Sequence, residues 1–425
     1  MTRADFVVRR VGLLASLAGP VPRTGTALRD LGLVADAALA AAAGRIVFVG
    51  PERELAAAVA VAPDAVVLDA EGGAVVPGFV DAHTHLAFAG DRDEEIRQRL
   101  AGASYQEIAA AGGGIVRTVA ATRRASHVEL CSGISGRLDE MLLAGTTSAE
   151  VKSGYGLETA AEIRSLEAIR DAAAAHPVRV VPTFLAHEVP VEHRERRERY
   201  IELLLAEMIP EVARRRLARF CDVFCEAGVF SIEESRRILV VAREQGLGLR
   251  IHADELADTG GARLAAELGA RSADHLVFVS ADGIAALARA ACVATLLPSA
   301  AFYLRLGRSA PARALIEAGA PVALASDVNP GGGLSPSLPF AMAIACFSMG
   351  LSLEEALAAV TVNAAYSLEL HGEAGSLEVG KQADLVVLRS TRLLDLVRVG
   401  VPSIRAVVKA GRVVVRDGRL VPRAA

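Results

Sequence analysis

The middle of this chain alternates short apolar strands with longer helical segments, and this repeat is the feature that most constrains its fold. Runs of β-branched and small apolar residues predict eight strands, at 75–83, 146–152, 178–185, 221–226, 248–252, 271–275, 292–297 and 321–326. Helical patterns lie between them, for example at 128–143, 158–175 and 232–244. Parallel strands need a crossover of this length, which is usually a helix. Eight such units predict an α/β fold, a closed (β/α)8 TIM barrel.

A doubly wound open sheet, built from the same units, is the alternative. Such sheets often bind a dinucleotide through a glycine-rich turn, and the sequence contains no fingerprint of that kind. We therefore expect the barrel.

The two ends of the chain differ from the middle, because they read as strands without long helices between them. The clearest terminal strands are at 44–50, 383–388, 404–409 and 412–416. We expect a small β-sandwich composed of residues 1–72 and 373–425, beside a barrel of residues 73–372. The helical pattern at 336–371 leads from the barrel back to the tail strands.

Composition excludes several classes of protein. The 425 residues are 52% hydrophobic and 23% charged, which is typical of a globular protein. The formal net charge of −4 provides no basic footprint for nucleic acid, and no apolar run is long enough to span a membrane. The apolar run 11–18 resembles a short signal peptide, but the segments after it read as continuous folded structure.

The chain has 5 cysteines, and an odd number argues against a disulfide framework. We therefore expect a reducing compartment, the cytoplasm. Cys221 and Cys225 have the spacing of half a zinc site, but no second pair exists, so we expect buried strand thiols.

Potential metal ligands stand where predicted strands end. His83 and His85 close the first strand, and side chains at i and i+2 point to the same side. His187 follows the third strand, while His252 and His275 end the fifth and sixth and Asp327 follows the eighth. Catalytic residues of such barrels lie at the carboxyl ends of the strands. Three imidazoles and one carboxylate, from His83, His85, His252 and Asp327, suit one divalent zinc or iron ion.

A metal site of this kind makes hydroxide available near neutral pH, which predicts hydrolysis at an sp² carbon. Glu255 lies three residues after His252 and is placed to carry a proton to a leaving nitrogen, with Asp254 as its rival. We expect His275 to hydrogen-bond the attacked oxygen or the water. A carboxylated lysine that bridges two metals would stand on the fourth strand, but Lys152 is on the second, so we favour one metal.

Several segments resemble the imidazolonepropionase family of the amidohydrolase superfamily. The run 76–85 and the histidines and aspartate at the later strand ends are features of the whole superfamily. The more specific matches are at 90–92, 111–115, 150–157, 251–255, 272–276 and 327–331. Among these, Ala-Gly-Gly-Gly-Ile and Lys-Ser-Gly-Tyr-Gly are the most specific.

The resemblance implies hydrolysis of the cyclic amide C–N bond of 4-imidazolone-5-propanoate to N-formimidoyl-L-glutamate, in the degradation of histidine to glutamate. It implies a metal at the four ligands above, and a homodimer acting on a small molecule. The expected catalytic residues are Glu255, His275 and Asp327. The expected substrate contacts, besides Glu255, are Arg92, Tyr155, His187, Asn329, Gly331 and Gly332.

The sequence departs from the family pattern at two places. The family's Phe-Leu-Gly-Ala-His-Ala is one residue shorter here, as Phe-Leu-Ala-His-Glu at 184–188. Gly332 stands where the family often has Ser or Thr, so a hydroxyl contact to the ligand is lost or is replaced by a backbone N–H.

Two other functions share parts of the pattern. Another one-metal amidohydrolase, such as a deaminase of a nucleobase or of formiminoglutamate, would keep the same ligands without needing Arg92 and Tyr155 together. A barrel that serves only as a scaffold usually loses metal ligands, and none is missing here.

Overall fold

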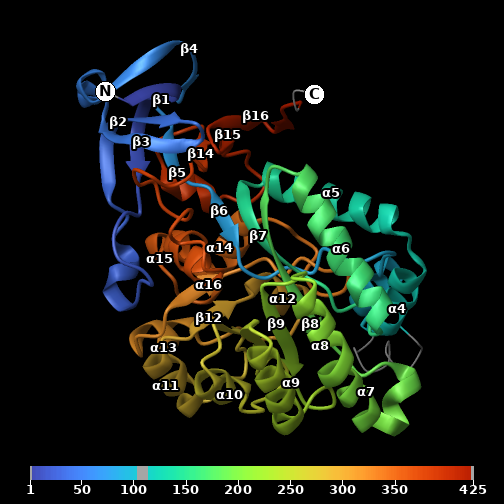
Figure 1. Cartoon of the computed structure of the whole chain (residues 1–425). Helices are drawn as coiled ribbons and strands as arrows, with labels where there is room; N and C mark the ends of the chain where they lie inside the picture. The colour runs from blue at the N-terminus through green and yellow to red at the C-terminus, as the bar shows by residue number, and fades with distance from the viewer. Residues whose placement is uncertain (1, 103–112, 423–425) are drawn as a thin grey trace.

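The structure is a computed structural model that describes residues 2–102 and 113–422. It contains two sheets, a mixed sheet from the ends of the chain and a parallel barrel from the middle (Figure 1). Ala111 and Gly112 of the motif at 111–115 lie outside the described residues. The structure confirms the expected barrel and the joining of the terminal strands in a separate β unit.

The mixed sheet has nine strands, in the order β17-β16-β15-β14-β5-β1-β2-β3, with β4 also paired to β1. Its strands are β1 (Thr2–Ala15), β2 (Leu33–Ala42), β3 (Arg45–Pro51), β4 (Val59–Asp69), β5 (Ala74–Pro77), β14 (Leu385–Leu388), β15 (Ile404–Lys409), β16 (Arg412–Arg416) and β17 (Arg419–Leu420). The central pairing of β5 with β14 joins the first and last parts of the chain.

The barrel has eight strands in sequence order, and each pairs with the next in parallel. They are β6 (Phe79–Asp81), β7 (Thr146–Lys152), β8 (Arg179–Ala186), β9 (Phe220–Cys225), β10 (Gly248–Ala253), β11 (Ser272–His275), β12 (Val293–Leu296) and β13 (Val322–Leu324). The seam between β13 and β6 is bridged at its carboxyl edge. There Asp327 N donates to His83 O at 3.1 Å, and His85 N donates to Val328 O at 2.9 Å.

Helices cover the outside of the barrel (Figure 1). Three of them, α5, α9 and α15, begin with a Ser-x-x-Glu capping box. The α-helices are α1 (Leu55–Ala58), α2 (Asp93–Leu100), α4 (Ile115–Arg124), α5 (His127–Leu143), α6 (Thr159–Ala175), α7 (Arg197–Leu203), α8 (Ile209–Arg214), α9 (Ile232–Glu244), α10 (Gly261–Leu268), α11 (Ala281–Ala290), α12 (Pro298–Tyr303), α13 (Ala312–Glu317), α14 (Leu338–Ser348), α15 (Leu353–Ala359) and α16 (Val362–Ser367). Short 3₁₀ segments are η1 (Gly25–Arg29), η2 (Glu52–Glu54), η3 (Val191–Arg196) and η5 (Leu393–Val397), and η4 (Leu204–Met208) is a π-helical turn.

Two predicted elements were wrong in detail. The single strand at 75–83 is two strands, because the chain leaves the mixed sheet after β5 and enters the barrel at β6. Gly78 makes this passage: its N–H donates to Asp384 O at 2.9 Å, and a Cβ there would overlap the Thr147 side chain. The helical pattern at 336–371 is three helices, α14, α15 and α16. The division of the chain at residues 72 and 372 stays a prediction.

The amino end of the barrel is filled with apolar side chains. Val181, Phe220 and Val293 pack there against Leu368 and the buried alanines of α16. Because this end is filled, the opposite end, where the strands end, is the one available to a ligand.

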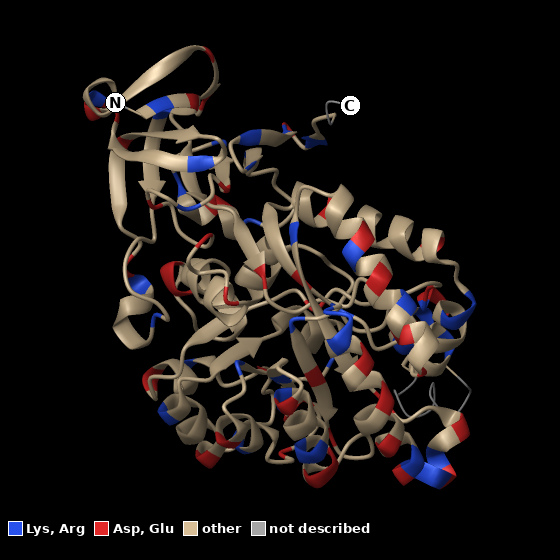
Figure 2. Ribbon diagram, in the orientation of Figure 1, with Lys and Arg blue, Asp and Glu red and all other residues tan. Residues whose placement is uncertain are grey.

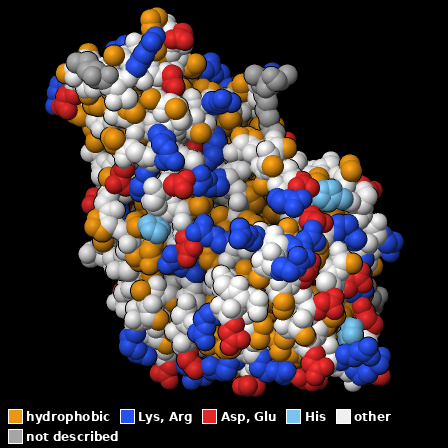
Figure 3. All heavy atoms as spheres, in the orientation of Figure 1, with side chains coloured by type: hydrophobic (Ala, Val, Ile, Leu, Met, Phe, Trp, Pro, Cys, Tyr) orange, Lys and Arg blue, Asp and Glu red, His pale blue; other side chains and the backbone are white. Residues whose placement is uncertain are grey.

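Charged residues are spread over the outer helices, with acidic and basic positions interspersed (Figure 2). The visible face of the surface shows the same mixture of signs (Figure 3). Within the described residues, no helix combines the length and the apolar character required to cross a membrane.

Candidate metal centre and active site

Four histidines and one aspartate meet at the carboxyl ends of the strands. His83 and His85 follow β6, His252 is in β10, His275 ends β11 and Asp327 follows β13. The ring of His83 lies 4.5 Å from that of His252 and 5.4 Å from that of His275, between centroids. All five side chains are buried.

Three donor atoms form a small triangle. His83 Nε2 lies 3.1 Å from His85 Nε2, and Asp327 Oδ1 lies 3.5 Å and 3.2 Å from these two nitrogens. Bonds of about 2.0–2.1 Å around a tetrahedral zinc ion place neighbouring donors about 3.3–3.4 Å apart. The triangle therefore has the dimensions of a metal site.

The protonation of His83 supports the same interpretation. Its Nδ1 lies 2.7 Å from Asp274 Oδ2, which holds the proton on Nδ1 and leaves a lone pair on Nε2. His252 Nε2, His275 Nε2 and Asp327 Oδ1 are buried without a hydrogen-bond partner. Buried polar atoms without partners are costly, and a cation bound among them would remove that cost. The residues present thus fit a divalent metal.

His275 lies closer to the predicted metal ligands than we expect from the sequence. One nitrogen each of His83, His252 and His275 lie within 4.8 Å of one another, as do the donor atoms of His83, His85 and Asp327. Both His275 and Asp327 have left-handed backbones, with φ of 75° and 54°. Such conformations are costly for residues with a Cβ and are retained mostly at functional sites.

Glu255 and its rival Asp254 occupy different environments. Glu255 lines the cavity, and its Oε1 lies 3.5 Å from His275 Nδ1. Burial, helped by the nearby Asp327 carboxylate, raises the pKa of Glu255 to about 8. Asp254 instead accepts four backbone N–H groups, from Thr259, Gly260, Gly261 and Ala262, and so holds the start of α10. Asp254 is a structural cap, which leaves Glu255 as the carboxyl group available for proton transfer.

A cavity of about 1260 Å³ opens above the histidines. Its walls contain the predicted residues His85, Arg92, Tyr155, His187, His252, Glu255, His275, Asp327, Asn329, Gly331 and Gly332. His83 lies beneath the wall and is fully buried.

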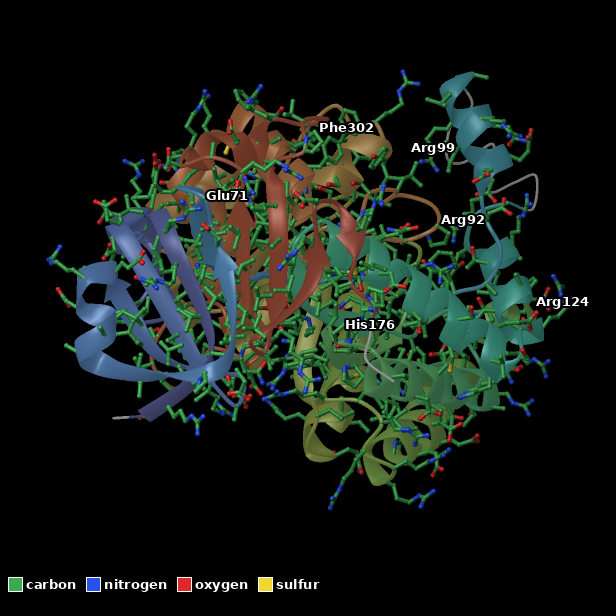
Figure 4. The ribbon with its side chains drawn as sticks, turned by 90° about the horizontal axis from the view of Figure 1, so that it is seen from above. Glu71, Arg92, Arg99, Arg124, His176 and Phe302 are labelled. Atoms are coloured by element: carbon green, nitrogen blue, oxygen red, sulfur yellow. The ribbon has the colours of Figure 1, made fainter. Side chains whose placement is uncertain are left out.

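Arg92 is held at the rim by two neighbours. Its Nε donates to Thr118 Oγ1 at 2.8 Å, and its guanidinium lies where a Cβ on Gly331 would be. Arg99, from the same segment, donates to Gly331 O at 2.9 Å. In Figure 4, Arg92 and Arg99 lie on one side of the barrel, between the segments of Phe302 and Arg124.

His187 reaches the cavity despite its shortened loop. Its ring stacks on that of His85 at 5.6 Å, and that of Tyr155 lies 5.1 Å away. His187 Nδ1 lies 3.1 Å from Gly154 O, which leaves Nε2 as the acceptor. The loop that carries Tyr155 is held by Glu162, whose carboxylate accepts from Gly154, Gly156 and Leu157 N–H.

The loop after Asp327 uses its polar groups internally. Asn329 Nδ2 donates to Asp327 O at 2.7 Å, and Asn329 Oδ1 accepts from Gly331 N and Gly332 N at 2.8 and 2.6 Å. In this conformation the Gly332 N–H is paired within the loop. Roles of these three residues in substrate binding stay predictions.

Sequence reasoning missed the charged residues beneath the histidines. Glu150, Asp222, Arg250 and Asp274 are all fully buried in the barrel, around Lys152. The available signal was the presence of charges within strands whose burial the barrel requires. Lys152 donates to Glu150 and Asp222 at 2.6 and 2.7 Å. The expectation of a single metal stays a prediction.

Comparison with solved structures shows the fold. An adenosine deaminase from Xanthomonas campestris with bound zinc covers 100% of this chain and 95% of its own, with a TM-score of 0.73 and 18% identity. An atrazine chlorohydrolase from Arthrobacter aurescens, complexed with zinc, covers 98% of this chain and 97% of its own, with a TM-score of 0.76 and 17% identity.

Comparison with sequences shows the family. Residues 108–415 match the model of the amidohydrolase family. Imidazolonepropionase from Symbiobacterium thermophilum is 52% identical over 415 residues, which are 97% of each chain. The enzyme from Geobacillus kaustophilus is 46% identical over 411 residues, 96% of this chain and 97% of its own. With likeness of this extent along the whole chain, and with the predicted ligands converging at the barrel mouth, the chain belongs to the imidazolonepropionase family of amidohydrolases, the hydrolases that open the imidazolone ring in histidine degradation.

Proposed function

We propose that this chain hydrolyses the cyclic amide C–N bond of 4-imidazolone-5-propanoate with one zinc or iron ion held by His83, His85, His252 and Asp327. The observation that carries the proposal is the triangle of His83 Nε2, His85 Nε2 and Asp327 Oδ1 beneath a cavity. The unpaired, buried His252 Nε2 supplies the fourth donor. A bound divalent ion lowers the pKa of its water toward 7 and so provides a hydroxide nucleophile.

Two side chains at the site handle protons and charge. Because the pKa of Glu255 is raised to about 8, its carboxyl group can hold a proton at neutral pH and pass it to the departing ring nitrogen. Burial lowers the pKa of His275 to about 4, so this imidazole is neutral. A neutral imidazole can donate one hydrogen bond to the carbonyl oxygen under attack.

Arg92, Tyr155 and His187 bind the substrate in this proposal. The substrate's carboxylate suits the forked donors of a guanidinium, which pair with both carboxylate oxygens. Arg92 is the partner because it is buried at the cavity rim and fixed by Thr118. The rings of Tyr155 and His187 lie edge to face, at an angle of 63°, and can contact the flat imidazolone.

The substitution Glu255→Gln tests the assignment of the proton carrier. We expect the variant to bind one metal ion per chain, as the parent does, and its kcat to fall by about 10²–10⁴-fold, the usual contribution of a general acid–base group. The substrate is unstable, so it is generated in place by urocanate hydratase, and its absorbance decay is followed against the spontaneous rate. Metal content is measured by elemental analysis.

An exposed glutamate provides the control. Glu267→Gln on α10 removes a carboxylate that pairs with Arg236 at the surface, and it should leave both activity and metal content unchanged. Loss of the metal together with activity in Glu255→Gln would show that Glu255 is structural. If the parent protein does not accelerate the decay of the imidazolone, the proposed substrate is wrong. Release of ammonia from a nucleobase or from formiminoglutamate would support a deaminase instead.

A homodimer in a reducing, cytoplasmic environment completes the proposal. The dimer rests on the family resemblance alone. The compartment is supported by all five cysteines, which are free in the structure. Light scattering after size-exclusion chromatography tests the dimer, and a mass of one chain would contradict it.

A further inference from the structure

Five charged side chains form one connected group inside the barrel, directly beneath the histidines. We call Glu150, Lys152, Asp222, Arg250 and Asp274 the ionic cluster. Lys152 Nζ donates to Glu150 Oε1 and Asp222 Oδ2 at 2.6 and 2.7 Å. Arg250 Nη2 donates to Asp274 Oδ2 at 3.2 Å, and Arg250 Nε lies 3.6 Å from Glu150 Oε1. Each member has a relative exposure of 0%.

The cluster contacts the side chains of two proposed metal ligands. Asp274 Oδ2 lies 2.7 Å from His83 Nδ1, and Asp222 Oδ2 lies 3.1 Å from His252 Nδ1. A carboxylate at Nδ1 holds the proton there, so that Nε2 is the nitrogen left to bind a metal. Asp274 therefore selects this tautomer for His83, and Asp222 places its carboxylate beside the corresponding nitrogen of His252.

The cluster also holds the backbone on both sides of His83. Arg250 Nη2 donates to Ala82 O at 2.8 Å. The Glu150 carboxylate accepts from Thr84 N at 3.3 Å through Oε2, and the main-chain carbonyl of the same residue accepts from Thr84 Oγ1 at 2.6 Å. Position and ring orientation of the first ligand are thus fixed by the same group of charges.

The charges of the cluster complement a dication. Three carboxylates and two cations leave one net negative charge, and Asp327, whose Oδ1 belongs to the donor triangle, adds another. Since the site is buried, these two charges lie in a medium that screens them weakly. A divalent ion bound at the triangle would neutralise them.

Stability alone does not account for the cluster. Replacement of a buried ion pair by apolar residues is often neutral or stabilising, because burial costs each ion its hydration. Arg250 Nε, Asp222 Oδ1 and Asp274 Oδ1 are buried without a hydrogen-bond partner. Inward-facing barrel positions are usually filled by branched apolar side chains. A group this costly points to a role at the site that it supports.

We propose that the ionic cluster is a positioning unit that sets the affinity and geometry of the metal site. The inference rests on the proposed metal site. It assigns roles to Glu150 and Arg250, which contact neither the side chain of a metal ligand nor the cavity. Lys152 pairs with both Asp222 and Glu150, and so joins the carboxylate beside His252 to the rest of the ionic cluster.

The test compares metal affinity in Glu150→Gln and Arg250→Lys with that of the parent. Both variants keep the approximate size of the side chain, and Arg250→Lys also keeps the charge. Zn²⁺ affinity is measured by competition with a chromophoric chelator, at a temperature at which all proteins are folded. We expect affinity to fall by about 10–100-fold in each, the usual effect of losing a group that orients a metal ligand.

A second readout reports geometry. The visible absorption of the Co²⁺-substituted protein depends on the arrangement of ligands, so we expect its spectrum to change in both variants. The matched control is Glu355→Gln, since Glu355 is also a buried glutamate in ion pairs, with Arg29 and Arg313, on α15. It should lose folding stability but keep the parent's Zn²⁺ affinity and Co²⁺ spectrum.

The outcomes separate this inference from the proposed function. A parent that binds no stoichiometric metal refutes the metal site itself. A parent that binds metal, with both variants within about twofold of its affinity and with unchanged Co²⁺ spectra, refutes the positioning role. If Glu150→Gln does not fold, the milder Arg250→Lys decides alone. An equal loss of affinity in Glu355→Gln would show that the effect follows general destabilisation, and would also overturn the proposal.

Discussion

At the scale of single residues, the site depends on where small side chains leave room for large ones. Gly331 is the clearest case, because the guanidinium of Arg92 occupies the space that a Cβ would fill. The same guanidinium is held by Thr118 from α4. A glycine therefore determines where the proposed carboxylate-binding group lies.

Gly331→Ala should raise KM for the imidazolone and leave the fold intact. The end of a long side chain can move away at little cost to the free energy of unfolding, but Arg92 then leaves its position. A hydrogen bond to a charged group contributes about 1.5–3 kcal/mol, so we expect KM to rise by about 10–100-fold. Steady-state kinetics and urea unfolding of the variant check this. Gly372→Ala, where a Cβ meets open space, is the control, and an unchanged KM in Gly331→Ala would contradict the placement of Arg92.

The cysteine thiols should react slowly with alkylating reagents. Burial raises the pKa of Cys225 and Cys346 to about 11 and that of Cys292 to about 12. The reactive thiolate is then about 0.1% of the thiol at pH 8 for a pKa of 11, and it increases about tenfold per pH unit up to the pKa. Labelling with iodoacetamide between pH 7 and pH 9, followed by mass spectrometry, measures the rates. The urea-unfolded protein is the control, and fast labelling of the native protein at pH 7 would contradict the expectation.

At the scale of elements, the passage from β5 to β6 couples the two sheets. β5 pairs with β1 and β14, whereas β6, two residues later, pairs with β7 in the barrel. The first two proposed metal ligands, His83 and His85, follow β6. Gly78 consequently links the register of the mixed sheet to the position of His83 and His85.

Gly78→Ala should destabilise the protein. A Cβ at this position overlaps the side chain of Thr147 in β7, and overpacking a buried contact costs about 1–3 kcal/mol. Urea unfolding of the parent and the variant measures the difference. The double variant Gly78→Ala with Thr147→Gly removes the overlap and should recover part of the loss. If Gly78→Ala and the parent were equally stable, the Cβ would fit beside Thr147 without strain, which would contradict this expectation.

At the scale of the whole molecule, the barrel closes beside the proposed metal site. The hydrogen bonds that bridge the seam join His83 to Asp327 and His85 to Val328. Three proposed ligands therefore lie just after the ends of β6 and β13, the first and last strands of the barrel. A metal bound across this seam would tie the first strand of the barrel to the last.

Removal of the metal should lower the thermal stability of the whole chain. A ligand that binds only the folded state stabilises it by about 4 kcal/mol when its free concentration is about 1,000 times Kd. Calorimetry before and after chelation, with metal restored as the reverse step, measures the shift in Tm. Glu255→Gln should show the parent's shift, and Asp327→Asn a smaller one. A Tm unaffected by chelation would argue against a metal that bridges the seam.

Much of the fold and the chemistry was predictable from the sequence. Seven of the eight predicted barrel strands lie close to their observed bounds, because buried parallel strands are mostly apolar and helices must separate them. The meeting of His83, His85, His252 and Asp327, the four proposed metal ligands, was predictable, since strand ends meet at one rim in any barrel. The division of the predicted strand 75–83 into β5 and β6 was not predictable, because both halves are apolar and they differ only in the strands with which they pair.

Residue patterns along the chain were enough to predict the kind of protein: strand–helix units for a barrel, metal-binding residue types at strand ends, and motifs that resemble those of one family. The tertiary structure decided which charges act together. Glu150, Asp222, Arg250 and Asp274 come from four different strands, and no local pattern shows that their side chains meet. It also decided that Asp254 caps α10 while Glu255 faces the cavity, although the two are neighbours in sequence. The physical reason is that periodicity reports the face on which a residue lies, whereas the partner found there depends on strands far away in the chain.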